Sequence, residues 1–116
     1  MGLANRARGA FGEQLVARWY EARGYTVVDR NWRDGRAGEL DLVVARSDGL
    51  LVFCEVKARA STAYGHPFEA VDARKLARVR RLAAAWLAAH DHHGVEVRID
   101  VAAVLGTVVE VLEAVG

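Results

Sequence analysis

Residues 39–59, ELDLVVARSDGLLVFCEVKAR, decide the fold. Two apolar runs flank the turn Ser47-Asp48-Gly49, a pattern typical of a β-hairpin. Side chains two positions apart on a strand share one face of the sheet. One face of the hairpin is therefore apolar, and it comprises Leu40, Leu42, Val44, Val52, Cys54 and Val56. The opposite face ends in charge, because each strand carries two ionisable residues there.

The register of the hairpin brings these charges together. Three-residue hairpin loops that end in glycine are common, and a loop over residues 47–49 places Asp41 opposite Glu55 and Glu39 opposite Lys57. Like charges directly opposite one another destabilise a sheet. Paired carboxylates therefore favour a cation between them, and oxygen ligands of this kind suit Mg²⁺ or Mn²⁺.

A slipped register is the alternative. A two-residue loop would pair Ser47 with Leu50 and set Asp41 against Val56. That arrangement would put the apolar face of one strand beside the charged face of the other, so we disfavour it.

Composition limits the class of protein. A chain of 116 residues is expected to form one domain, residues 1–116. Its single cysteine, Cys54, excludes an internal disulfide and fits a reducing compartment, and its place on the apolar face predicts a packed core residue. No apolar run reaches the roughly 18 residues of a membrane span and no signal-peptide pattern begins the chain. We expect a cytoplasmic protein with no membrane partner.

Charge is distributed unevenly along the chain. Residues 39–57 carry a net charge of −2, whereas residues 1–38 and 58–90 carry +3 and +4. An acidic centre between two basic segments is typical of a metal site that acts on a polyanion.

A first helix is predicted over residues 4–23, and Gly24 ends it. Its apolar stripe comprises Phe11, Leu15, Trp19 and Ala22. Glu13 lies at the margin of this stripe, beside Gly9 and Gly12, each of which costs roughly 1 kcal/mol in a helix interior. These small neighbours would let another backbone or a ligand approach Glu13, although a solvated helix residue is the simpler interpretation.

A second helix is predicted over residues 68–89. Its buried side comprises Val71, Leu76, Val79, Leu82, Trp86 and Leu87. A basic stripe on another side comprises Arg74, Lys75, Arg78 and Arg81, at helical spacings of three and four. Such a stripe is either a solvated face or a phosphate-binding surface.

Strands are also predicted over residues 26–33, 95–105 and 108–112. The first of these and the hairpin follow one another with short turns, which favours an antiparallel meander. Asp100 interrupts the 95–105 strand, and we interpret it as a solvent-facing residue in preference to one that supports the site. The loop 60–67 follows the charged strand, so we expect it to overhang the charged cluster.

Two groups of residues that include histidines have explanations simpler than a functional role. Tyr64 and His66 could touch a substrate from their loop, but turn chemistry is the slightly favoured explanation of them. The group His90, His92 and His93 follows the second helix, where cationic side chains are favourable at a helix C-terminus, and no further ligands at suitable spacing indicate zinc.

The order of the charged motifs resembles a known nuclease pattern. Asp41 followed by Glu55-x-Lys57 resembles the PD-(D/E)xK nuclease superfamily. A longer ordered set comprises Gly12-Glu13, Arg30-Asn31, Gly38-Glu39-Leu40-Asp41-Leu42, Phe53-Cys54-Glu55-Val56-Lys57-x-Arg59, Tyr64-Gly65-x-Pro67 and Lys75. That set resembles the YraN-like family, small bacterial proteins regarded as candidate endonucleases, and archaeal Holliday-junction resolvases are similar in layout.

The resemblance implies an α/β restriction-endonuclease-like core, a mixed sheet of about five strands flanked by helices. It implies that Asp41 and Glu55 are metal ligands, with the Val56 carbonyl as a third. Lys57 would position or deprotonate the attacking water, and Glu13 would complete the acidic cluster.

The expected function is a metal-dependent endonuclease that hydrolyses phosphodiester bonds in DNA with Mg²⁺ or Mn²⁺. Residues expected to bind nucleic acid are Arg59, Tyr64, Arg74, Lys75, Arg78 and Arg81. No base-reading element is evident, which favours structure-selective cleavage of branched, flapped or single-stranded DNA. The alternatives are a non-catalytic nucleic-acid-binding or partner module on the same fold, and a structural ion-pair network that joins Glu39 to Lys57 and Asp41 to an arginine. A homodimer is compatible with the sequence.

Overall fold

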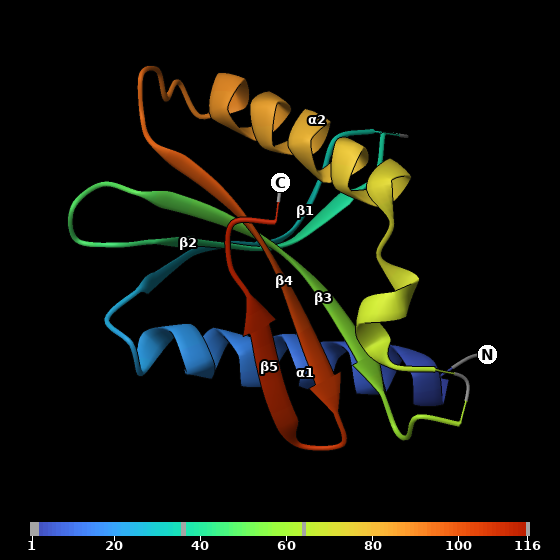
Figure 1. The fold of residues 1–116 in the computed structure, drawn as a ribbon. Helices are drawn as coiled ribbons and strands as arrows, with labels where there is room; N and C mark the ends of the chain where they lie inside the picture. The colour runs from blue at the N-terminus through green and yellow to red at the C-terminus, as the bar shows by residue number, and fades with distance from the viewer. Residues whose placement is uncertain (1–2, 36, 64, 116) are drawn as a thin grey trace.

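The computed structural model describes residues 3–35, 37–63 and 65–115. In these residues the chain forms an α/β fold, a five-stranded mixed sheet with helices on both faces (Figure 1). The elements are α1 (Leu3–Glu21), β1 (Thr26–Arg33), β2 (Glu39–Ala45), β3 (Leu51–Arg59), the 3₁₀ helix η1 (Pro67–Ala70), α2 (Ala73–Ala89), β4 (Val97–Leu105) and β5 (Val108–Leu112). The predicted fold class is therefore confirmed.

The strands follow their sequence order across the sheet, β1-β2-β3-β4-β5. All neighbours are antiparallel except β3 and β4, which are parallel. A parallel pair requires a crossover connection, and η1 and α2 supply it. The predicted antiparallel meander of the first three strands is confirmed.

The register of the β2–β3 hairpin is also confirmed. The Arg46 amide donates to the Leu50 carbonyl at 2.9 Å, which leaves residues 47–49 as the loop. Paired residues run from Ala45 with Leu51 to Leu42 with Cys54, as the three-residue loop requires. The paired ladder ends at Leu42, however, and β2 continues from there beside β1, where Glu39 pairs with Arg33.

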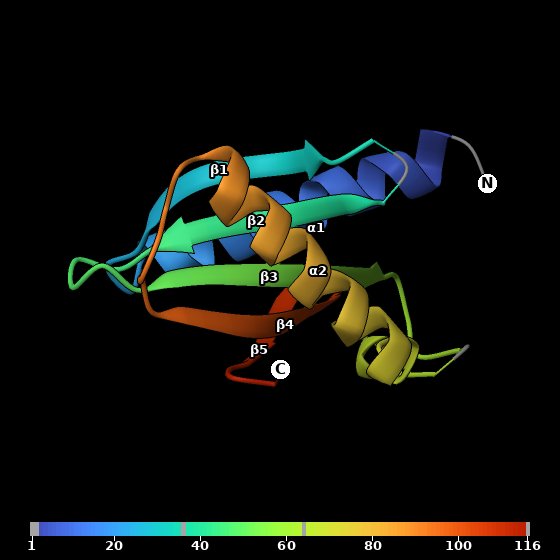
Figure 2. The same cartoon turned by 90° about the horizontal axis from the view of Figure 1, so that it is seen from above.

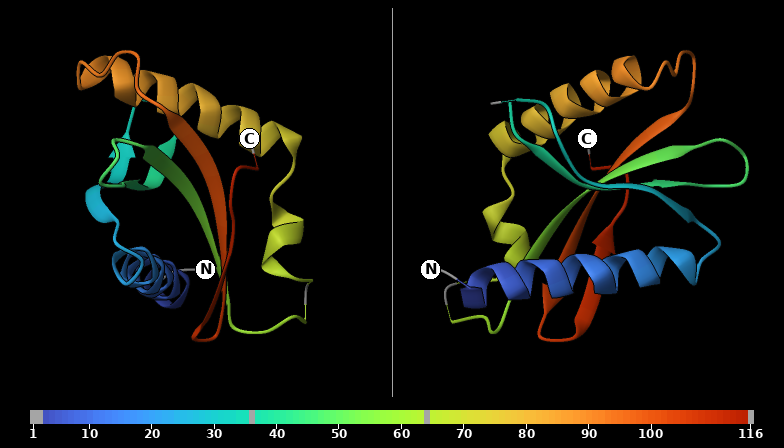
Figure 3. Two further views of the ribbon diagram at one scale, coloured as in Figure 1. Left: turned by 60° about the vertical axis from the view of Figure 1, so that its left-hand side comes forward. Right: turned by 180° about the vertical axis from the view of Figure 1, so that it is seen from behind.

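Alternate residues of the strands enter two separate cores. The core beneath α1 contains Val16, Ala17, Tyr20, Leu42, Val44, Leu50, Val52, Cys54, Ala102 and Val104. The core beneath α2 contains Leu40, Val43, Leu51, Phe53, Val79, Leu82, Ala83, Trp86 and Ile99. The two helices lie on opposite faces of the strongly twisted sheet (Figures 2 and 3). Cys54 is buried in the first core as predicted, and burial raises the pKa of its thiol.

Leu40 does not share the face predicted for it. The sequence placed it with Leu42 and Val44, but it packs in the core beneath α2. At this position β2 has left β3 and pairs with β1 alone. The alternation established along the hairpin therefore does not extend to Leu40.

The buried face of α1 also differs from the predicted stripe. Phe11 is 49% exposed and Ala22 is exposed, while Val16, Ala17 and Tyr20 are buried. Leu15 and Trp19 lie only partly buried at the edge of the core. Close packing at Gly12, described below, turns the face containing residues 16 and 20 toward the sheet, which rotates the large residues of the stripe to its margin.

The predicted second helix is interrupted near its beginning. Val71 is extended between η1 and α2, and Asp72 caps α2 by accepting a hydrogen bond from the Lys75 amide. His66 caps η1, so the turn-chemistry interpretation of this residue is supported. Neither α1 nor α2 combines the length and apolar character that crossing a bilayer would require.

Asp100 is fully buried, which contradicts its assignment to the solvent. It lies in β4 opposite Cys54 and faces α1. Its carboxylate accepts hydrogen bonds from the Tyr20 hydroxyl at 2.6 Å and from the Arg98 guanidinium, with both nitrogen–oxygen distances at 2.9 Å. Arg98, two residues before Asp100 on the same strand, offsets the cost of burying this charge.

Candidate active site

The site begins where α1 makes its closest approach to the sheet. A Cβ atom added to Gly12 would lie 2.8 Å from Cβ of Ala58 in β3, closer than side chains pack. Glycine at this position therefore lets the helix backbone rest directly on the strand. The next residue is Glu13, so the close contact brings its carboxylate to the edge of the sheet.

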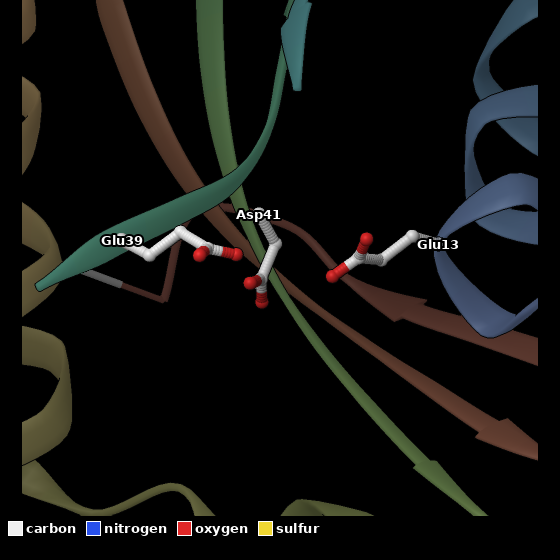
Figure 4. A group of neighbouring side chains, drawn as sticks. All are labelled: Glu13, Glu39 and Asp41. Atoms are coloured by element: carbon white, nitrogen blue, oxygen red, sulfur yellow. The ribbon is translucent and has the colours of Figure 1, made fainter. Parts of the chain in front are cut away.

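Three carboxylates converge there. Oxygen atoms of Glu13, Glu39 and Asp41 all lie within 4.8 Å of one another. Figure 4 shows Glu13 reaching from α1 toward Asp41 and Glu39, which project from β2. We call these three residues the acidic triad. Carboxylate oxygens at this separation are a suitable ligand set for a divalent cation such as Mg²⁺ or Mn²⁺.

Asn31 links two members of the triad. Its side-chain amide donates to Oε1 of Glu13 at 2.9 Å and to Oε1 of Glu39 at 3.0 Å. Its backbone φ is +49°, a left-handed conformation that asparagine tolerates better than most residues. A single neutral side chain thus holds the carboxylate from the helix beside the carboxylate from the strand.

Asp41 lies in the opening between β2 and β3. If the hairpin ladder continued past Leu42, the Val56 amide would donate to the Leu40 carbonyl. It donates instead to Oδ2 of Asp41 at 2.8 Å. The carboxylate therefore replaces a backbone acceptor, which fixes its position at the end of the ladder.

The electrostatic environment of Asp41 is unfavourable for a negative charge. Burial, followed by the charge of Glu55, raises the pKa of Asp41 to about 8, and the hydrogen bond from Val56 only partly opposes this. Burial also raises the pKa of Glu13, against the lowering effect of Asn31. The negative charge of the triad is only weakly compensated. The Arg33 guanidinium lies 3.1 Å from Glu39, but its side chain is 71% exposed, so solvent screens its charge.

Glu55 lies beside the triad, although it is not part of it. The residue is only 8% exposed, and its Oε1 lies 3.9 Å from Nζ of Lys75 in α2. After burial, its charge is nevertheless the main cause of the raised pKa of Asp41. The predicted pair of acids is therefore adjacent, but the tightest group includes Glu39, whereas Glu55 is directed toward a lysine.

Lys57 follows on the same strand as Glu55. Burial lowers the pKa of its amine, and the positive charges of Lys75 and Arg59 lower it further. Glu39 does not pair with Lys57 as the extended hairpin register predicted, because β2 and β3 have separated before that point. Glu39 contacts Asn31 and Arg33 instead.

The predicted basic stripe of α2 lines a groove. Its cations, together with Asp72, surround a cavity of about 380 Å³; they are Arg74, Lys75, Arg78 and Arg81. Gly38, with φ of +128°, lies beneath this helix, where an added Cβ would lie 3.3 Å from Leu82 and 3.5 Å from Arg78. We call this feature the α2 groove. Through Lys75 and Gly38 it adjoins the acidic residues.

The structure places most of the predicted site residues in one region. Glu13 and Asp41 belong to the triad, and Glu55, Lys57 and the Val56 amide adjoin it. The charge of Arg59 lowers the pKa of the Lys57 amine, and both residues border a cavity between α1 and the end of β3. Tyr64 lies outside the residues that the structure describes.

Sequence reasoning did not assign a site role to Glu39 or Asn31. Both stand within the ordered motifs, as Gly38-Glu39 and Arg30-Asn31. The signal in the sequence that could have identified these two residues is their place inside those motifs. Their spatial relation depends on the separation of β2 from β3, which the alternation of side chains does not reveal.

Comparison with known proteins gives consistent matches. The model of the Uncharacterised protein family UPF0102 matches residues 12–104. A UPF0102 protein of Beutenbergia cavernae is 62% identical over 104 residues, which cover 90% of this chain and 86% of that protein. Another from Frankia casuarinae is 56% identical over 98 residues, 84% of this chain and 81% of that protein. A third, from Acidothermus cellulolyticus, is 46% identical over 112 residues, 88% of this chain and 83% of that protein.

Proposed function

The chain belongs to the uncharacterised protein family UPF0102, and from its site we propose that it is a metal-dependent endonuclease that hydrolyses phosphodiester bonds in DNA. The observation that carries this proposal is the convergence of the acidic triad beside Glu55 and Lys57. Carboxylates that can hold a metal ion, next to an amine and flanked by cations, are groups that can catalyse phosphodiester hydrolysis. The resemblance of the motif order to the YraN-like family and the PD-(D/E)xK superfamily supports the same reaction.

The donor set fits a hard divalent cation. Three carboxylates within 4.8 Å of one another have oxygen ligands only, which Mg²⁺ and Mn²⁺ prefer. The pKa of Asp41 is raised first by burial and then by the charges of neighbouring carboxylates, so the negative charge of Asp41 lacks compensation that a cation would supply. Glu13, Glu39 and Asp41 would hold the ion, with Glu55 and the Val56 carbonyl as further candidates. When bound, the ion supplies a Lewis acid that polarises the phosphate and lowers the pKa of water.

The protein's own groups would then orient the reactants. In hydrolysis a water oxygen bonds to phosphorus, the bond from phosphorus to the leaving sugar oxygen breaks, and a proton reaches that oxygen. Lys57 would hold the attacking water or stabilise the negative charge that develops on the phosphate. Its lowered pKa makes the neutral amine, which can accept a proton from water, more accessible than in an exposed lysine.

The α2 groove would bind the DNA backbone. Arg74, Arg78 and Arg81 offer positive charge at helical spacing, and Lys75 joins the groove to the acidic residues through Glu55. Phosphate contacts position a duplex or strand without reading its sequence. Selectivity for branched, flapped or single-stranded DNA is therefore the form of specificity that we propose, and cutting two strands symmetrically would require a homodimer.

The direct test is cleavage of fluorescent linear, flapped, single-stranded and four-way DNA with Mg²⁺, Mn²⁺ or chelator. We expect cleavage only with metal, and a loss of about 10²–10⁴-fold in Lys57→Ala, the range typical of removing a catalytic acid–base group. Asp41→Asn should cause a loss of similar size, because it removes a proposed ligand of the ion. Asp48→Asn is the matched control, since Asp48 is an exposed carboxylate paired with Arg46 in the hairpin loop. Cleavage that survives Lys57→Ala, or that persists in chelator, would contradict the proposal.

A non-catalytic nucleic-acid-binding or partner module is the second candidate. The α2 groove favours it, because those cations can bind phosphates whether or not the triad holds a metal. Calorimetric titrations separate the two candidates. DNA binding without any Mg²⁺ or Mn²⁺ binding would favour the module, whereas metal binding that Asp41→Asn removes would favour the nuclease.

A further inference from the structure

Two charged residues are buried in the part of the chain that the structure describes, Asp100 and Glu55. Asp100 accepts hydrogen bonds from two nitrogens of Arg98 at 2.9 Å, so its charge is closely compensated. Glu55 is 8% exposed, but the cation paired with it, Nζ of Lys75, lies 3.9 Å away, beyond hydrogen-bonding distance. Glu55 therefore has a counter-ion that is held only loosely.

The position of Lys75 in α2 is unfavourable for a cation. Lys75 is the third residue of the helix, and its amide donates a hydrogen bond to the capping residue Asp72 at 2.9 Å. The N-terminal end of a helix carries a partial positive charge, which disfavours a cation in the first turn. The Lys75 side chain is nevertheless only 25% exposed, with its amine beside Glu55. Helix stability does not account for a lysine at this position, whereas the charge of Glu55 does.

A second amine lies near the same carboxylate. Lys57 stands two residues after Glu55 in β3, and the charge of Lys75 contributes to lowering its pKa. Two neighbouring cations repel each other. Among the described residues Lys75 forms an ion pair with Glu55, and Lys57 does not. The two lysines therefore differ in role, since Lys75 compensates Glu55 and Lys57 remains free for the reaction.

We propose that Lys75 is a positioning residue for Glu55, whose carboxylate it holds as a counter-ion until a divalent ion replaces it. A divalent ion carries twice the charge of the amine and takes carboxylate oxygens as ligands, so it can displace a lysine that does not hydrogen-bond to them. The displaced amine then joins the other cations of the α2 groove. The exchange rests on the proposed function for its metal ion, but the counter-ion role does not require DNA cleavage.

The first test is the thermal stability of the full chain in chelator. Lys75→Met removes the charge and keeps the length and the helix propensity of the side chain. We expect Tm to fall by about 4 °C, as for a domain of this size that loses a partly buried ion pair.

The Glu55→Gln background isolates the ion pair. There Lys75→Met should leave Tm unchanged or raise it, because it removes only the repulsion by Lys57 and the unfavourable charge at the helix N-terminus. A fall in Tm of equal size in both backgrounds, or no fall in the wild-type background, would overturn the proposal.

The second test is Mn²⁺ binding, measured by calorimetry at 0.15 M salt. Lys75→Met should tighten binding by about tenfold, because the ion no longer competes with the amine for Glu55. Arg80→Met is the control, since it removes a charge from an exposed position on the same helix and should change the affinity by less than about twofold. In the Glu55→Gln background Lys75→Met should tighten binding by less than about threefold, because the competition is absent. An unchanged affinity in Lys75→Met, or an equal gain in both backgrounds, would show that no exchange takes place.

Failure of the proposed function would appear differently. Mn²⁺ binding that tightens in Lys75→Met, without cleavage of any DNA, would contradict the nuclease and support the exchange. Metal-dependent cleavage with a Mn²⁺ affinity that does not respond to Lys75→Met would support the nuclease and contradict the exchange. If neither wild type nor Lys75→Met binds Mn²⁺, both are wrong.

Discussion

Asp41 and Asp100 are two aspartates of one sheet with opposite surroundings. Asp100 is fully buried and saturated, with hydrogen bonds from Arg98, Tyr20 and the Ala114 amide. Asp41 is partly buried and accepts one backbone hydrogen bond, while its neighbours are other carboxylates. Asp100 is thus paired with an arginine of the protein, whereas Asp41 is surrounded by carboxylates.

The difference separates a structural role from a functional one. A buried carboxylate with a built-in arginine contributes to the fold and has little capacity for a further ligand. Burial and the charge of Glu55 raise the pKa of Asp41 to about 8, because both disfavour its ionised form. A bound cation would stabilise that ionised form. Burial and charge compensation together therefore distinguish the two sites, and burial alone does not.

The largest predicted effect concerns Asp100. Asp100→Asn should lower the free energy of unfolding by about 3 kcal/mol, because it removes the carboxylate that Arg98 contacts through two nitrogens in a site where the arginine side chain is only 15% exposed. Glu113, 3.6 Å from the guanidinium and 51% exposed, compensates that charge only in part. Urea denaturation measures the change. Asp41→Asn, the same chemical substitution, is the control and should not destabilise the metal-free protein. Similar losses in both variants would mean that the two aspartates do not differ in role.

The next effect is stabilisation by metal. A saturating concentration of Mn²⁺, about 100 times Kd, should raise the free energy of unfolding by about 2.7 kcal/mol, since the ion binds only the folded site. For a domain of this size, such a change shifts Tm by roughly 10 °C. Thermal melts with and without chelator measure it.

Asp41→Asn is the variant in which that shift should disappear, whereas Asp48→Asn should retain it. Asp48 is exposed and paired with Arg46, so its removal leaves the triad intact. An equal Tm shift in wild type and Asp41→Asn would place the ion elsewhere. The absence of any shift in wild type would remove the case for a metal at the triad.

The sequence predicted the hairpin and its register because local rules determine both. The loop Ser47-Asp48-Gly49 and the side-chain alternation around it depend only on neighbouring residues, and the pairing of Leu42 with Cys54 confirms them. Asp100 was misassigned because its exposure depends on a parallel strand and on α1, which are distant in sequence. Glu39 was set against Lys57 by extending a ladder that ends at Leu42.

The third effect is a dependence on pH in the metal-free protein. Asp41 has an ordinary pKa near 3.8 and a pKa of about 8 in the folded state. Because the folded state holds the proton more tightly, stability contributed by the protonated carboxyl is present at low pH and is lost as pH rises from about 4 to about 8. Tm in chelator should therefore fall over this interval.

Asp41→Asn isolates the contribution of Asp41, since the amide oxygen can still accept from the Val56 amide. Relative to wild type, this variant should be about equal in stability at pH 5 and more stable at pH 9, by on the order of 1–2 kcal/mol. Paired urea titrations at the two pH values measure the difference. A variant that is less stable than wild type at pH 9 would show that the charge of Asp41 stabilises the fold, as the ion-pair alternative requires.

The smallest predicted effect concerns Asn31. Its hydrogen bonds to Glu13 and Glu39 test whether these carboxylates are held together for a metal ion. Asn31→Asp keeps the size of the side chain and tolerates the same positive φ, but it replaces the donor shared by Glu13 and Glu39 with a further negative charge. In chelator at pH 8 the variant should lose about 0.5–1 kcal/mol of stability, a modest amount because the residue is exposed. Saturating Mn²⁺ should reduce that deficit, since the ion compensates the added charge. A deficit that is the same with and without Mn²⁺ would mean that Asn31 acts on the fold and not on the metal-binding carboxylates.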